Sequence, residues 1–292
     1  MAVTDSWVPP SRDQWEWVVS IFQLFPLFTV VQYVSLINDN LYIMGKTSKD
    51  GWFNIPGRIG WITMEVPGTI ALLYCMITIP EDGVNSLPLG NKILGSLFAI
   101  HYLNRAVIGP ILNPSMAPMS PFVWFFALIF QLMNGTSIGG WLAGYGSPAK
   151  GLWAGDANLA ISERFMAGVL IWALGFAGNI WHDEDLREIR RSAGREQERN
   201  AKNDGKANVD KVYRVPVNGL FRWILYPHYV CEWIEWAGFW LAAGSGFIPA
   251  RNFLLNEIST MAPRAVQGKQ WYEQKFGKDK IAGKKALIPG IL

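Results

Sequence analysis

Residues 59–79 read IGWITMEVPGTIALLYCMITI, an apolar run that contains one carboxylate, Glu65. About 20 mostly apolar residues are enough for a helix to cross a bilayer, so this run predicts a transmembrane helix. A charge at that depth is unfavourable unless it faces protein or water, which makes Glu65 a functional candidate. The structural alternative is a carboxylate that hydrogen-bonds to a neighbouring helix. We favour an acid or orienting group for a buried substrate.

Further apolar runs follow the same pattern. Half of the 292 residues are hydrophobic, and the mean hydropathy is positive. Together with residues 59–79, these runs predict an all-α polytopic membrane protein with about seven transmembrane helices. We expect a polar N-terminal lead over residues 1–14 and a single transmembrane domain over residues 15–292. The other runs are residues 18–37, 93–112, 122–142, 161–180 and 219–248, and a weaker one at 253–266.

Basic residues indicate the orientation of these spans. Nine Lys and Arg lie in residues 183–216 and seven more follow from Arg264, while alternate loops carry few. The positive-inside rule then places the N-terminus in the lumen and the C-terminus in the cytosol. The N-terminus lacks the basic start of a signal peptide, so the first span is expected to act as the insertion signal.

Polar side chains recur at helical spacing inside the other spans. His101 and Arg105 are four residues apart and share a helix face, whereas Tyr102 is rotated by about 100°. Near an acid, Tyr102 is a plausible proton donor to a carbonyl or enolate oxygen. Glu232 and Glu235 also share a face, in a run that Gly219 and Pro227 predict to be bent or broken.

A polar stripe begins in the fifth span and ends in the charged segment after it. Its members are Asn179, Asp183, Arg187 and Arg190, spaced four, four and three residues apart. The structural interpretation is an ion-paired helix end that extends the fifth helix into the cytosol. The functional interpretation is a cavity wall whose arginines hold a phosphate-rich cofactor.

Several functions have no support in the sequence. No Rossmann or Walker glycine pattern occurs, and the three histidines lie on separate segments, so no metal site is expected. Two cysteines in apolar runs exclude a disulfide framework. The sequence Asn134-Gly135-Thr136 matches the glycosylation pattern, but it lies within an apolar run and is interpreted as chance. Nothing favours nucleic-acid binding.

Ordered motifs from about Gly45 to the C-terminus resemble the steroid 5α-reductase family. GK at 45–46, PGR at 56–58 and WITMEVP at 61–67 resemble its early motif, and HYLNR at 101–105 resembles H-Y-x-x-R, with LN at 112–113 after it. NIWHD at 179–183 resembles N-I-x-x-D. The later matches are YRVPVNGLF at 213–221, EWIEW at 232–236, WYEQKF at 271–276 and KALIP at 285–289.

The resemblance implies seven transmembrane helices, NADPH as hydride donor and reduction of a C=C bond conjugated to a carbonyl. It implies that Glu65 and Tyr102 are catalytic, binding the carbonyl oxygen of a lipophilic 3-oxo-Δ4-steroid, in the endoplasmic reticulum membrane. Residues 113–292 would carry most of the cofactor site. The implied cofactor-binding residues are Lys46, Arg105, Asn113, Asn179, Asp183, Arg187, Arg190, Tyr213, Arg214, His228, Glu232 and Tyr272.

Some positions depart from the steroid enzymes and leave other substrates open. Met64 stands where those enzymes often have Gln, and His228 resembles the P-H-Y of polyprenol reductases. The alternatives are a polyprenol reductase, a trans-2-enoyl-CoA reductase and, in a different class, a non-catalytic sterol-binding membrane protein. A methyltransferase of related helical architecture is more distant. The joint presence of Glu65, Tyr102 and the cofactor-matching set favours the reductase.

Overall fold

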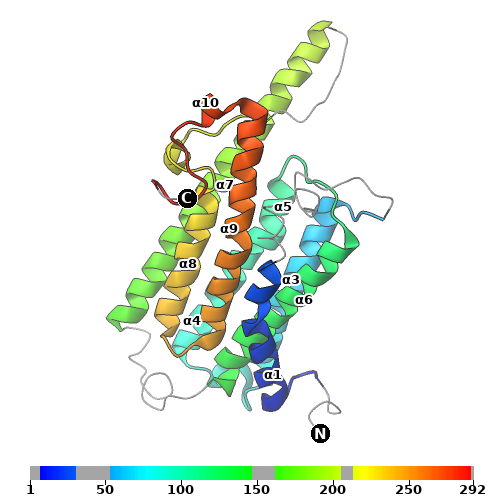
Figure 1. Cartoon of the computed structure of the whole chain (residues 1–292). Coiled ribbons are helices and arrows are strands. Elements are labelled where there is room, and N and C mark those ends of the chain that lie inside the picture. Colours follow the sequence, from blue (N-terminus) through cyan, green and yellow to red (C-terminus); the bar gives the residue numbers. More distant parts are fainter. Residues whose placement is uncertain (1–6, 31–52, 147–161, 205–212, 291–292) are drawn as a thin grey trace.

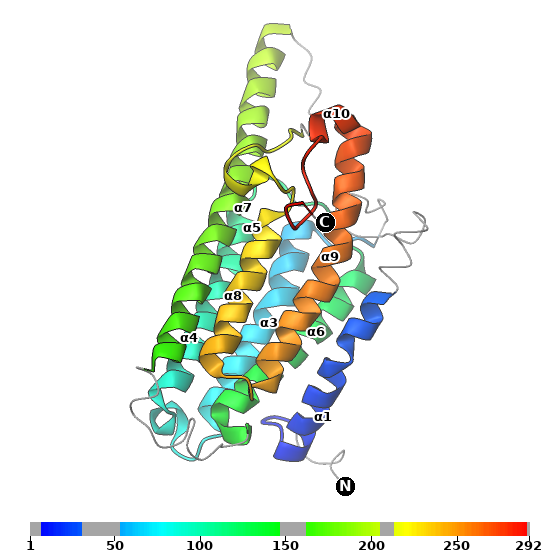
Figure 2. The ribbon, with the colours of Figure 1, turned by 60° about the vertical axis from the view of Figure 1, so that its left-hand side comes forward.

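The computed structural model describes residues 7–30, 53–146, 162–204 and 213–290. Over these residues the chain is helical, and its only extended pairing consists of isolated bridges, Ile55 with Met119 and Ile224 with Lys285. The long helices run side by side along one direction (Figures 1 and 2), which confirms the all-α prediction.

The first helix is fixed at its start by a capping box. In α1 (Arg12–Gln23) the Ser11 hydroxyl accepts from the Gln14 backbone N–H at 3.3 Å, and the Gln14 side chain accepts from the Ser11 N–H at 2.9 Å. The 3₁₀ turn η1 (Phe25–Thr29) follows. The predicted first span, 18–37, therefore covers parts of α1 and η1, and its last residues lie outside the described part of the chain.

The second and third predicted spans form helices with local irregularities. The helix α3 (Gly57–Thr78) contains Pro67 within its length and Glu65 just before it. After η4 (Gly83–Ser86), α4 (Leu89–Tyr102) passes into a π-helical segment, η5 (Leu103–Ile108), and then α5 (Gly109–Leu112). Single π turns within helices are frequent at functional sites, and this one contains Arg105.

The fourth span forms α6 (Pro121–Gly140), which continues as η6 (Trp141–Tyr145) and packs closely on α3. Glycines allow the two backbones to touch. A Cβ on Gly135 would lie 1.9 Å from the carbonyl oxygen of Gly68, and one on Gly139 would lie 2.7 Å from the Cα of Leu72. Small residues four apart permit this approach between membrane helices.

The fifth helix is the longest. The helix α7 (Glu163–Asp204) continues through the charged segment and projects beyond the rest of the bundle (Figure 2), as the extension of the fifth helix predicted. Its apolar half exposes Met166, Leu170 and Leu174 at four-residue spacing. An apolar stripe of this kind on an outer helix face is expected where the neighbour is lipid.

The sixth predicted span is broken, as Gly219 and Pro227 indicated. It consists of the 3₁₀ turn η8 (Gly219–Arg222) and α8 (Pro227–Ala243), which packs along α7. The weak seventh run lies within a longer helix, α9 (Ile248–Phe276), followed by α10 (Lys278–Ile281).

The tail returns to the break before α8. Leu225 donates its backbone N–H to the Lys285 carbonyl at 2.9 Å, and Tyr226 donates to Ala286 at 3.0 Å. The Lys284 ammonium donates to the carbonyl oxygens of Phe221 and Pro216, and burial lowers the pKa of Lys284.

Among the described residues, three helices are long and apolar enough to cross a membrane: Gly57–Thr78, Pro121–Tyr145 and Glu163–Arg199. The chain is therefore treated as an integral membrane protein. The core between the helices is filled by large side chains, among them Phe98, Trp236 and Phe253. The count of seven spans and the orientation of the termini remain predictions.

We predict that Gly135→Ala destabilises the protein, because the added methyl group would push α6 away from the backbone of Gly68. Overpacking of this kind lowers the free energy of unfolding by about 1–3 kcal/mol. The measurement is the apparent melting temperature of the detergent-solubilised protein, followed by tryptophan fluorescence.

The matched control for that prediction is Gly194→Ala in α7, where a Cβ would meet no atom within 4 Å. Since alanine is the better helix former, this change should leave the melting temperature unchanged or raise it. Equal losses in the two variants would contradict the role of the glycine contact.

Candidate active site

Glu65 lies inside the bundle and is held by two other helices. Its side chain is 3% exposed. Its Oε2 accepts from the Nε2 amide of Gln131, in α6, at 2.5 Å. Its Oε1 lies 3.4 Å from the Nε of Arg105, in the π-helical segment. The carboxylate predicted from the sequence therefore faces protein and not lipid.

Tyr102 is also buried, at the last turn of α4. The Nδ2 amide of Asn134, in α6, donates to its phenol oxygen at 3.1 Å. The Tyr102 ring packs against Phe98 and Trp236, with ring centroids 4.5 and 6.4 Å away. Gln131 interacts with both Glu65 and Tyr102, so the two predicted catalytic groups share one environment.

Arg105 joins the two sides of the bundle. Its Nη1 donates to the Oε1 of Glu232, in α8, at 2.8 Å, while its Nε faces Glu65. The Trp61 indole donates to the Arg105 carbonyl at 3.1 Å. A guanidinium placed between two buried carboxylates compensates part of their desolvation, which a lone charge would not survive.

A second acid from the same face of α8 binds the imidazole predicted to face it. His101 Nδ1 lies 2.7 Å from the Oε1 of Glu235, and His101 Nε2 lies 3.8 Å from the Oε1 of Glu232. From α7, Asn179 Nδ2 donates to the Oε2 of Glu232 at 3.3 Å and to the His228 carbonyl at 3.0 Å. His101 and Arg105 thus approach the same carboxylate, as their spacing predicted.

We call this set the buried polar cluster. It draws on α3, α4, η5, α6, α7 and α8, and comprises Glu65, His101, Tyr102, Arg105, Gln131, Asn134, Asn179, Glu232 and Glu235. All but Arg105 are buried, and Arg105 is half-buried. The cluster has the composition of a polar reaction site inside an apolar bundle.

Sequence reasoning missed three members of this region. Gln131 and Asn134 lie in the fourth span, where the only remark on Asn134 was its chance match to a glycosylation pattern. Glu257, in α9, is buried, and its charge interacts with those of Arg105 and Glu65. Each is a polar residue within an apolar run, which is the signal that identified Glu65 and could have identified these three.

The predicted cofactor residues beyond Asn179 follow α7 toward its charged end. Arg187 is buried and pairs with Glu184 at 2.8 Å and with Asp183 at 3.9 Å. Arg190 and Tyr213 interact electrostatically with Tyr272, in α9. Between Asn179 and Arg190 the helix rises by about 16 Å, so this predicted stripe forms a continuous path away from the buried polar cluster.

The remaining predicted residues are placed less directly. The Asn113 carbonyl accepts from the Arg58 guanidinium at 2.9 Å, and Arg214 pairs with Glu196 in α7. His228 meets Asn179 through its backbone carbonyl. Lys46 lies outside the residues that the structure describes. No group of three or more His, Cys, Asp or Glu within the described ranges could hold a metal ion.

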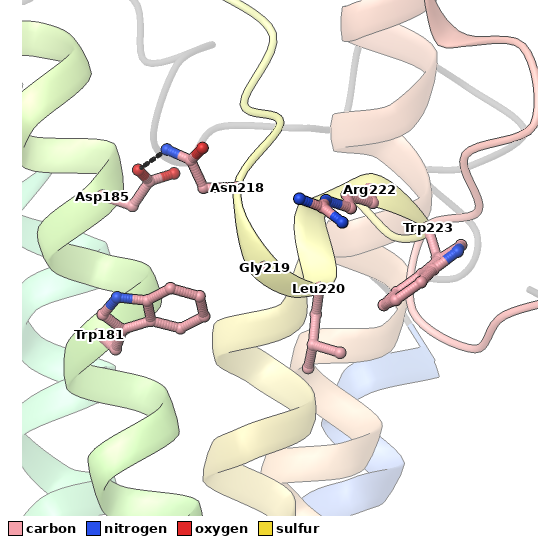
Figure 3. Close-up of a pocket in the computed structure, with 7 residues that line it drawn as sticks. All are labelled: Trp181, Asp185, Asn218, Gly219, Leu220, Arg222 and Trp223. Carbon is pink, nitrogen blue, oxygen red and sulfur yellow. Dashed lines mark hydrogen bonds between the residues drawn. The ribbon is translucent and has the colours of Figure 1, made fainter.

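A hollow of about 580 Å³ lies between α7 and η8 (Figure 3). At its edge, Asn218 donates to the Oδ1 of Asp185 at 2.6 Å, which ties η8 to α7. This hollow is separate from the predicted site residues. Its lining residues are Trp181, Asp185, Asn218, Gly219, Leu220, Arg222 and Trp223.

Comparison with known proteins agrees with the motif pattern. The family described as 3-oxo-5-alpha-steroid 4-dehydrogenase matches residues 117–292, well over half of the chain. An uncharacterized protein of Schizosaccharomyces pombe is 34% identical over 278 residues, which are 91% of this chain and 94% of that protein.

Two relatives carry enzyme names. Bovine (Bos taurus) 3-oxo-5-alpha-steroid 4-dehydrogenase 1 is 30% identical over 82% of this chain and 83% of its own length. The steroid 5-alpha-reductase DET2 of tomato (Solanum lycopersicum) is 28% identical over 91% of each chain. From its matched residues and these relatives, the chain belongs to the 3-oxo-5-alpha-steroid 4-dehydrogenase, or steroid 5α-reductase, family.

Proposed function

We propose that this protein reduces the C=C bond of a lipophilic enone, a 3-oxo-Δ4-steroid, to its 5α-reduced product, with NADPH as the hydride donor. The observation that carries this proposal is that Glu65 and Tyr102 meet in one buried polar cluster, where Gln131 interacts with both. Membership of a family whose relatives bear steroid reductase names supports the substrate class.

Glu65 and Tyr102 would bind the carbonyl oxygen of the enone. Reduction at the β-carbon moves negative charge onto that oxygen, and hydrogen-bond donors fixed in a dry site stabilise such charge strongly. A proton then adds at the α-carbon and completes the saturated ketone. The aromatic side chains of Phe98 and Trp236 keep the Tyr102 ring in place and exclude water from around it.

The residues along α7 fit a phosphate-bearing dinucleotide by their chemistry. Guanidinium groups match phosphate oxygens in geometry, and Arg187, Arg190 and Arg214 supply them. In this structure Arg187 and Arg214 pair with carboxylates, on Glu184 and Glu196, which shows that their forks are available to anions. The tyrosines Tyr213 and Tyr272 add aromatic surface beside Arg190.

NADPH, when bound, would supply the hydride. The residues that would hold it are Asn113, Asn179, Asp183, Arg187, Arg190, Tyr213, Arg214 and Tyr272, with Arg105, His228, Glu232 and Lys46 toward its reacting end or rim. Within the described residues, Asn179 connects the two groups, because it bonds Glu232 in the buried polar cluster and begins the stripe along α7.

The proposal includes the seven spans and an endoplasmic reticulum location. The N-terminus would be lumenal and the arginine-rich end of α7 cytosolic, on the side where NADPH is made available. The apolar stripe of α7 and the lipid-facing aromatic residues of α6, such as Phe122 and Phe126, support an enzyme whose substrate arrives through the bilayer.

We predict that the purified protein oxidises NADPH only when a lipophilic enone is present. Absorbance at the nicotinamide band would be followed with a Δ4-3-ketosteroid, a 2-enoyl-CoA and a polyprenol-type enal as separate substrates. Turnover of the steroid alone supports the proposal. Preference for either of the others would assign the chain to that reaction, and NADPH-independent steroid binding without turnover would leave only sterol binding.

We predict that Glu65→Gln and Tyr102→Phe each lower kcat by about 100- to 1,000-fold, because each removes a group that stabilises charge on the carbonyl oxygen. NADPH binding, measured by fluorescence, should be retained. The matched control is Tyr74→Phe, the same chemical change at a partly exposed position of α3. Unchanged steroid turnover in both site variants would refute these roles.

For the cofactor, we predict that Arg187→Met raises the KM for NADPH by about tenfold or more, the effect of losing one charge-assisted hydrogen bond. The KM for the steroid should change little. Arg199→Met, at the exposed end of the same helix, is the control. If both variants bind NADPH like the wild type, the assignment of α7 to the cofactor is wrong.

A further inference from the structure

Two amide side chains of α6 contact the two proposed catalytic groups. Gln131 and Asn134 are three residues apart on one face of the helix, and their side chains are 5% and 0% exposed. Gln131 bonds Glu65, and Asn134 bonds Tyr102. Their other amide atoms, Gln131 Oε1 and Asn134 Oδ1, are buried and have no hydrogen-bond partner among the described residues.

The bond from Asn134 determines which way the Tyr102 hydroxyl can point. A phenol has one hydrogen to donate and an oxygen that accepts. Because the Asn134 N–H donates to that oxygen at 3.1 Å, the Tyr102 hydrogen is not used in this contact. It remains available to donate to another acceptor, and a substrate ketone oxygen is an acceptor.

Gln131 restrains the other group in a complementary way. Its Nε2 donates to the Glu65 Oε2, while Arg105 faces the Oε1 of the same carboxylate. An amide carries both a donor and an acceptor, so rotation of the Gln131 amide lets it bond Glu65 whether that group is ionised or protonated. A donor-only side chain such as lysine could not do this.

The backbone places both amides. A Cβ added to Gly68 would lie 2.6 Å from the carbonyl oxygen of Gln131, and Gly135 touches Gly68 directly. The turn of α6 that carries Gln131 and Asn134 is therefore pressed against the turn of α3 that carries Glu65. Catalytic groups need to be held to a fraction of an ångström, and rigid helix contacts provide that precision.

We propose that Gln131 and Asn134 are positioning residues: Asn134 directs the Tyr102 hydroxyl toward the substrate oxygen, and Gln131 fixes the carboxyl of Glu65 beside it. This inference rests on the proposed function, since it assigns how the same two catalytic groups are oriented. Neither amide contacts the substrate in this scheme.

The sharpest test compares Asn134→Asp with Asn134→Ala. The aspartate is nearly isosteric, but when ionised it only accepts, so the Tyr102 hydroxyl would turn toward it and away from the substrate. We expect kcat to fall at least about tenfold further in Asn134→Asp than in Asn134→Ala, with KM for the steroid within about threefold of wild type. A merely structural role would not split kcat from KM in this order.

Gln131 is tested by Gln131→Met, which keeps the length of the side chain and removes both hydrogen-bonding atoms. We expect kcat to fall by about tenfold while the dissociation constant of NADPH is unchanged. The control on the same helix is Leu132→Ala, whose side chain is exposed on the outer surface. That variant should keep the wild-type kcat.

If Asn134→Asp does not accumulate as folded protein, Asn134→Ser replaces it. Serine keeps a hydroxyl donor, so its kcat should exceed that of Asn134→Ala, and an equal or lower value would overturn the assignment of Asn134. Parallel losses of melting temperature, NADPH binding and kcat in the Gln131 and Asn134 variants would also overturn the proposal, because they indicate a purely structural role.

The outcomes separate this inference from the function beneath it. Loss of turnover in Glu65→Gln and Tyr102→Phe, together with wild-type kcat in Gln131→Met and Asn134→Asp, would reject only the positioning roles. Full steroid turnover in Glu65→Gln and Tyr102→Phe would instead reject the proposed catalytic roles themselves.

Discussion

Arg105, placed between the carboxylates of Glu65 and Glu232, is the interaction on which the interior depends. Acidic groups inside an apolar bundle are tolerated only when paired, and removing one partner of such a pair leaves an uncompensated buried charge. Glu65 comes from α3 and Glu232 from α8, so the pairing requires both helices to face η5. The positions of His101 and Asn179, which approach Glu232, follow from the same requirement.

Close backbone packing brings the remaining polar groups within reach. Between lipid-facing helices no hydrophobic effect drives association, so van der Waals contact and buried hydrogen bonds have to hold them together. The glycines at 68, 135 and 139 allow α3 and α6 to touch, and the amides of Gln131 and Asn134 reach Glu65 and Tyr102 across that contact. The structural contact between these helices and the geometry of the candidate site are thus one feature.

Much of the fold and part of the site were accessible from the sequence. Hydropathy located the helical runs, Gly219 and Pro227 located the break before α8, and the charged segment after Ile180 was identified as an extension of the fifth helix. The residues Glu65, His101, Tyr102, Arg105 and Glu232 were selected because polar groups inside apolar runs are rare. Spacing within one helix also gave the shared faces of His101 with Arg105 and of Glu232 with Glu235.

What the sequence determined by itself is local: which segments are apolar helices and which side chains share a face, because hydropathy and the 3.6-residue period act within a single segment. The tertiary structure alone decided which faces meet. It joined Gln131 to Glu65, Asn134 to Tyr102 and His101 to Glu235, pairs separated by 66, 32 and 134 residues. Such partners depend on how neighbouring helices rotate and approach, and nothing in the spacing along either helix specifies that.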